Sequence, residues 1–73
     1  MPFMDKSTDR LIKHFGTRRA AILKISEALE VHEETVRLWF VDGIPLSRAI
    51  DIERGSGGVV TAEQILREAK AAA

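Results

Sequence analysis

The sequence has 73 residues, enough for one small domain, and its 11 basic and 11 acidic side chains give a formal net charge of zero. Zero net charge counts against a protein that coats nucleic acid regardless of sequence, because such binding depends on neutralising many phosphates, but it permits one basic face. The lack of cysteine excludes disulfides and thiolate metal sites and suggests a reducing, cytoplasmic setting. No apolar run approaches the roughly 20 residues that a membrane span requires.

The first expected helix covers residues 7–15 and follows a flexible tail at residues 1–5. Asp5 or Ser7 would cap this helix, and Gly16 would end it. Its apolar side chains recur at helical spacing, which predicts a buried face made of Leu11, Ile12 and Phe15.

A second helix is expected over residues 18–30 with Thr17 as its N-cap, because neither glycine nor proline interrupts this segment. With side chains spaced about 100° apart, its apolar residues form one stripe made of Ala21, Ile25, Ala28 and Leu29, with Ile22 at the edge. Leu23 lies away from this stripe and is therefore a candidate contact for a partner molecule.

The third and fourth expected helices lie on either side of a short break. The third covers residues 33–41 and ends at Gly43. The fourth covers residues 46–54, because Pro45 suits the start of a helix. Its expected buried face consists of Leu46, Ala49 and Ile50.

A fifth helix is expected over residues 62–69, because Thr61 and Gln64 have the spacing of a capping box. The alanine-rich residues 70–73 are expected to fray. The sequence therefore predicts an all-α fold, with one domain over residues 6–69.

The second and third helices are joined by about three residues and are apolar on their facing sides, which predicts a helix-turn-helix. On the third helix, Val36 and Trp39 face inward, whereas Phe40 belongs either to the core or to a contact with a partner chain. The opposite side carries two apolar residues, one base and one acid, which are Leu38, Val41, Arg37 and Glu34, with Glu33 on its flank.

Three stretches occur in a fixed order: HFGTRRA at 14–20, ALEVHEETVRLW at 28–39 and GIPLSRAIDIERGSGGVVT at 43–61. This series resembles the phage Cro repressors and the related Cro-like, YdaS-type regulators, over about residues 10–66. The resemblance implies a lambda-repressor-like DNA-binding fold, a compact bundle of about five short helices whose third helix enters the major groove.

The chain departs from the pattern of this family at the helix-turn-helix. The segment between Gly16 and Val31 is about four residues longer than expected, which adds about one helical turn to helix two and keeps its stripe in phase. Glu30 stands where a turn glycine is usual, although a left-handed backbone costs a glutamate about 1 kcal/mol more than a glycine. His32 replaces the usual serine cap, and Glu33 replaces the usual glutamine.

Four basic side chains are candidate contacts to the DNA backbone, with simple solvation as the alternative. Arg18 and Arg19 begin the second helix, where N–H groups and cations of a helix-turn-helix meet phosphates. By resemblance, Arg18 matches the glutamine that usually holds a phosphate. His32 starts the third helix near an expected phosphate, and Arg48 is expected to touch the backbone on the other side.

The outer side of the third helix supplies candidate contacts to bases, each with a structural alternative. Arg37 is expected to contact guanine or else to pair with Glu33 or Glu34. These two acids either stabilise the helix start through its dipole, accept a hydrogen bond from cytosine, or penalise wrong sequences. Leu38 and Val41 are expected to touch thymine methyl groups or to form an apolar patch for another protein.

Two functions are compatible with these features. The first is a sequence-specific repressor that binds a near-palindromic operator in double-stranded DNA as a homodimer, with Leu23 or the last helix at the dimer contact. The second is a protein-interaction module, such as an antitoxin or a phage-assembly component, whose contact surface holds Leu23, Leu38, Phe40 and Val41. No catalytic set, metal-ligand pattern or phosphate-cradling glycine loop occurs, so no enzyme activity, metal, cofactor or small-molecule substrate is expected.

Overall fold

A computed structural model describes residues 6–72 of the chain and places five α-helices in that range without any strand. The helices are α1 (Ser7–Phe15), α2 (Arg18–Leu29), α3 (Glu33–Asp42), α4 (Ala49–Gly55) and α5 (Ala62–Ala72), and a short 3₁₀ helix, η1 (Leu46–Arg48), precedes α4. The predicted all-α fold is confirmed. Within residues 6–72 no helix has both the length and the apolarity needed to cross a bilayer.

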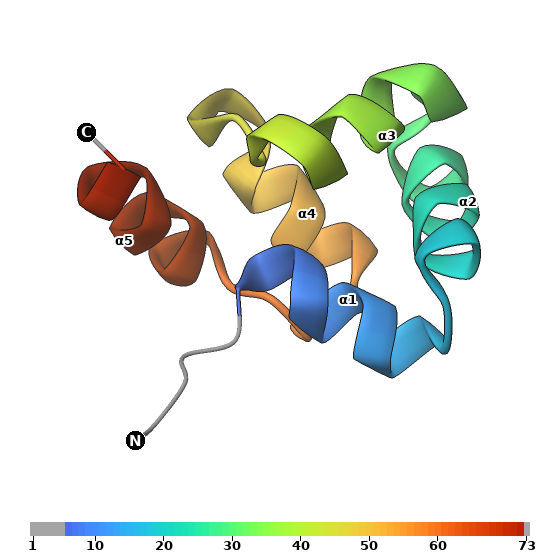
Figure 1. Cartoon of the computed structure of the whole chain (residues 1–73), viewed down its shortest axis with the longest axis horizontal. Helices are drawn as coiled ribbons and strands as arrows, with labels where there is room; N and C mark the ends of the chain where they lie inside the picture. The colour runs from blue at the N-terminus through green and yellow to red at the C-terminus, as the bar shows by residue number, and fades with distance from the viewer. Residues whose placement is uncertain (1–5, 73) are drawn as a thin grey trace.

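The helices form a bundle around α4 (Figure 1). Helix α2 packs against α1, α3 and α4, while α5 packs against α4 and η1 on the far side of the molecule from α2. Helix α3 therefore lies at the edge of the bundle, where one of its sides is left open to solvent.

The core draws side chains from every helix except the short η1. Its fully buried members include Leu11, Ile25, Val36, Ile52 and Ile65. The predicted inward side of α3 is confirmed, because Val36 and Trp39 are both buried. The structure also decides between the two interpretations of Phe40, which belongs to the core cluster.

The prediction for the fourth helix is wrong in its buried face. Ala49 is buried as expected, but the side chains of Leu46 and Ile50 are 51% and 59% exposed, and Ile52 is buried in their place. The expected face assumed an α-helix from residue 46 onward. Residues 46–48 instead form a 3₁₀ turn with fewer residues per turn, so the helix that follows starts in a different phase.

Helices α2 and α4 cross closely because Gly55 has no side chain. A Cβ atom built on Gly55 would lie 2.7 Å from Leu29 Cδ1 and 3.1 Å from Ala28 Cβ. Ala28 was expected in the buried stripe of α2, but it is exposed and lies at the rim of this crossing. The residue opposite Ala28 is a glycine with no side chain to cover it, and the helical periodicity of α2 does not reveal which residue lies opposite.

Two carboxylates tie helix α5 to the rest of the bundle. Near the start of α5, Glu53 Oε1 accepts a hydrogen bond from the N–H of Ala62 at 2.7 Å. The expected cap at Thr61 is confirmed, because Thr61 Oγ1 accepts a hydrogen bond from the N–H of Gln64 at 3.1 Å. Further along the helix, Glu68 contacts the first turn of α1. The helix continues to Ala72, three residues beyond the expected end at residue 69.

Glu68 explains why the expected cap of α1 is wrong. Ser7 lies inside α1, fully buried, and Lys6 is the N-cap residue. The N–H and the hydroxyl of Ser7 both donate to Glu68 Oε2, each at 2.8 Å. The start of α1 therefore receives its acceptor from a residue near the other end of the domain; Asp5, the alternative cap, lies outside the described residues.

Candidate nucleic-acid interface

The turn between α2 and α3 has the left-handed backbone that a turn glycine usually provides. Glu30 adopts this conformation, with φ 57° and ψ 44°, and is the sole non-glycine residue with positive φ among residues 6–72. The N–H groups of Glu30 and Val31 both point to the carbonyl of Ser26, the latter at 3.1 Å. These bonds close the end of α2 and set the direction in which α3 leaves the turn.

We expect the variant Glu30→Gly to be about 1 kcal/mol more stable than Glu30→Ala, because the Cβ of alanine is strained at positive φ whereas glycine is not. Both variants lose the same carboxylate, so the comparison isolates the backbone. Urea denaturation followed by Trp39 fluorescence measures the difference. Equal midpoints for the two variants would show that the left-handed turn carries no strain.

His32 begins α3 and serves as its cap. Its Nδ1 accepts a hydrogen bond from the N–H of Glu34 at 3.1 Å, as a serine hydroxyl does in an ordinary cap. The replacement of the usual serine therefore preserves the start of the helix. It also places an exposed imidazole at the positive end of the α3 dipole.

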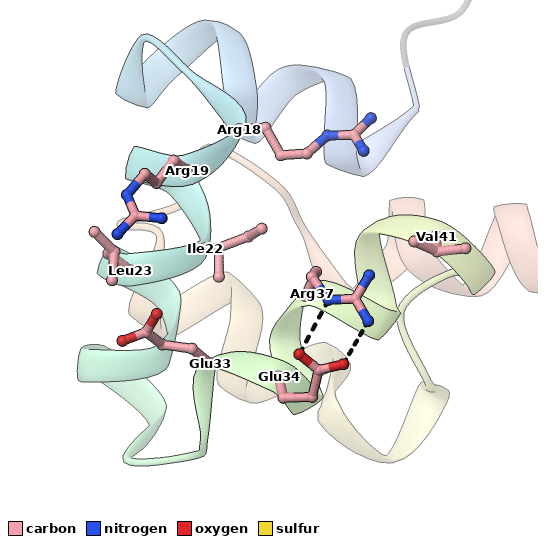
Figure 2. Close-up of a pocket in the computed structure, with 8 residues that line it drawn as sticks. All are labelled: Arg18, Arg19, Ile22, Leu23, Glu33, Glu34, Arg37 and Val41. Atoms are coloured by element: carbon pink, nitrogen blue, oxygen red, sulfur yellow. Dashed lines mark hydrogen bonds and ion pairs between the residues drawn. The ribbon is translucent and has the colours of Figure 1, made fainter.

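The open side of α3 and the first turns of α2 form one shallow groove (Figure 2). Six of the nine predicted site residues line it, together with two apolar side chains of α2, Ile22 and Leu23. The six are Arg18, Arg19, Glu33, Glu34, Arg37 and Val41. The predicted outer side of α3 is thus exposed, and the helix-turn-helix brings it next to the two arginines that begin α2.

The cations of this groove fall into two kinds. Arg37 is paired with Glu34: its Nε donates to Glu34 Oε1 at 3.1 Å, and a terminal nitrogen donates to Oε2. The hydrogen bond from Arg37 lowers the pKa of the Glu34 carboxyl, and the same bond raises the pKa of Arg37, so the pair stays ionised at neutral pH. Arg18 and Arg19, by contrast, are exposed and form no ion pair within residues 6–72.

A family model described as DNA-binding transcriptional regulator Cro, the P22 Cro family, matches residues 7–70. The chain belongs to this family. It is accordingly a DNA-binding transcriptional regulator of Cro type, which confirms the resemblance drawn from the sequence. The match runs from the first residue of α1 into the last turns of α5. Searches among curated proteins and among solved structures found no match.

The remaining predicted site residues of this Cro-family chain lie outside the groove. The Arg48 guanidinium stands over the Trp39 ring, 6.0 Å from its centre, and pairs with Asp51 at 3.5 Å. His32 caps α3, and Leu38 is 45% exposed on the same helix.

The sequence reasoning missed one lining residue of the Cro-family groove. Ile22 was placed at the edge of the buried stripe of α2, and the structure shows it half-buried between α2 and α3 (Figure 2). The position of Ile22 at the edge of the buried stripe could have indicated this role, because a residue at the border of a core face also borders the neighbouring surface. Leu23, the apolar residue that lies away from the buried stripe of α2, lies beside Ile22 in the groove.

Proposed function

We propose that this Cro-family regulator represses transcription by occupying a near-palindromic operator as a homodimer, with α3 of each subunit in the major groove. One observation carries the proposal: the exposed side of α3 and the unpaired arginines at the start of α2 share a single groove. The exposed side of α3 offers hydrogen-bond donors and methyl groups, which can contact the edges of bases. The arginines beside it can contact phosphates.

The unpaired cations are assigned to the DNA backbone. Arg18 and Arg19 lie in the first turn of α2, where the helix dipole adds to their attraction for phosphate. His32, the N-cap residue of α3, and Arg48, at the start of α4, are assigned to flanking phosphates. Their contacts would set the register of the protein on the duplex without reading its sequence.

The open side of α3 is assigned to the bases. Arg37 donates to guanine, the commonest partner of arginine in the major groove, and Leu38 and Val41 contact thymine methyl groups. Val41 is 61% exposed, so its methyl groups are available for such a contact. Glu33 and Glu34 weaken binding to DNA of any sequence, because a carboxylate near a phosphate is repelled, so that stable binding requires the favourable base contacts as well. Two copies of α3 in a dimer would lie about 34–36 Å apart, one turn of DNA.

Selection of bound sites from random duplex DNA, followed by titration of salt against the selected duplex, tests the proposal. We expect log affinity to fall steeply with log salt concentration, and Arg18→Ala to make the slope shallower by about 0.9, because this variant neutralises one phosphate fewer. Arg37→Ala is expected to lose about 10- to 100-fold in preference at one base position with little change of slope. Arg67→Ala is the control, since Arg67 is exposed on α5 and paired with Glu63.

Sedimentation of the protein with and without the selected duplex tests the dimer. Two subunits per duplex and inverted half-sites about one helical turn apart are the expected result. A selection that enriches no sequence, or a complex with one subunit per duplex and a single half-site, would contradict the proposal.

A second candidate function, binding of a protein partner, rests on the exposed apolar side chains of α3 and on the half-buried Leu23 of α2. Leu38 and Val41 are large, apolar and exposed, and Leu23 lies in the same groove as Val41. An apolar protein contact would depend little on salt, so the same titration distinguishes the two functions. Family membership favours DNA.

A further inference from the structure

The ion pair on α3 determines which edge of the Arg37 guanidinium remains available. Glu34 occupies the edge formed by Nε and one terminal nitrogen. A guanidinium has five N–H groups in one plane. Two of them donate to Glu34, so the edge formed by the two terminal nitrogens keeps one outward N–H from each.

The remaining edge has the shape that guanine requires. Two parallel N–H groups of an arginine match the N7 and O6 acceptors of guanine in the major groove. Figure 2 shows the unpaired nitrogen of Arg37 pointing away from Glu34. The pair is exposed and leaves this edge open to solvent rather than to the protein.

We propose that Glu34 is a positioning residue: it contacts no base itself, and it holds Arg37 so that one edge of the guanidinium faces a guanine. This inference rests on the proposed function. A long arginine side chain loses rotamer freedom when it binds, and a partner that fixes it beforehand reduces that loss. The carboxylate also occupies the second edge, so that Arg37 cannot donate to an alternative base through it.

Glu33 supplies a matched control for Glu34. Both acids lie in the first turn of α3 and are exposed, so both interact similarly with the helix dipole and with nearby phosphates. The Glu33 carboxylate forms no ion pair or hydrogen bond within residues 6–72, whereas the Glu34 carboxylate engages Arg37 through both of its oxygens. An effect that follows substitution of Glu34 but not of Glu33 is therefore due to the loss of the contact with Arg37 and not to the loss of a negative charge.

The test is selection from a random duplex library by the whole protein and by E33Q, E34Q, E34A and R37A, with affinities measured on the selected duplex and its single-base variants. The native protein is expected to select a guanine whose preference R37A abolishes. At that position the preference falls about 3- to 10-fold in E34A, less in E34Q, which keeps one acceptor oxygen, and not in E33Q. The sequence-averaged affinity rises alike in E33Q and E34Q, because each loses one charge that repels phosphate.

Circular dichroism confirms that each variant is folded. Equal guanine preference in E34A and the native protein would overturn the positioning role while leaving the proposed function intact. A loss of affinity in R37A that is uniform over all duplexes would overturn it as well, because Arg37 would then contact phosphate. No enrichment by the native protein would overturn the proposed function and this inference together.

Discussion

The substitution Ile25→Ala is expected to lower the free energy of unfolding by about 2–5 kcal/mol. Ile25 is fully buried in α2, the helix that packs against α1, α3 and α4. Removing its side chain loses the transfer free energy of three carbon atoms and leaves a cavity that the surrounding helices fill only in part. A domain of this size has a stability of a few kcal/mol, so a large share of the variant should be unfolded at room temperature.

Urea denaturation followed by the fluorescence of Trp39, the single tryptophan of the chain, measures this loss. The matched control is Ile50→Ala, the same chemical change at a side chain that is 59% exposed. We expect the control to stay within about 0.5 kcal/mol of the native protein. If Ile50→Ala were as destabilising as Ile25→Ala, the phase of α4 that leaves Ile50 exposed would be wrong.

The second large effect is expected at Glu68. Its replacement by alanine removes the acceptor of two hydrogen bonds from Ser7 and leaves a buried N–H and a buried hydroxyl without a partner. Hydrogen bonds to a charged group are stronger than neutral ones, and unsatisfied buried donors carry a penalty of their own. We expect Glu68→Ala to lower the free energy of unfolding by about 2–4 kcal/mol.

Glu63→Ala is the control, because Glu63 lies on the same helix in an exposed pair with Arg67, and such pairs contribute little. The double variant Ser7→Ala with Glu68→Ala separates the hydroxyl bond from the backbone bond. The two losses are expected to be less than additive. Strict additivity would indicate that Ser7 and Glu68 do not interact in solution.

Much of this fold can be predicted from local signals. Thr17 and Thr61 cap their helices as their spacing indicated, since each hydroxyl reaches the N–H three residues further on. The left-handed backbone of Glu30 was expected only through the resemblance to the Cro family, in which a glycine is usual at this position of the turn. What could not be predicted depends on partners distant in the sequence: the cap of α1 comes from Glu68, and the closeness of α2 and α4 comes from Gly55.

The candidate site was easier to predict than its internal chemistry. Helical phase alone places Glu34, Arg37 and Val41 on the open side of α3, and the turn brings them to Arg18. Phase does not decide which of two adjacent acids pairs with Arg37. Both Glu33 and Glu34 are within helical reach of it, and the structure selects the i,i+3 partner.

The bond between Ser7 and Glu68 joins residues 61 positions apart. A ribosome makes the chain from its N-terminus, so α1 emerges long before its acceptor exists. The first turn of this helix therefore lacks its acceptor until residue 68 has been synthesised, so helices α2, α3 and α4 are made before α1 can gain this stabilisation.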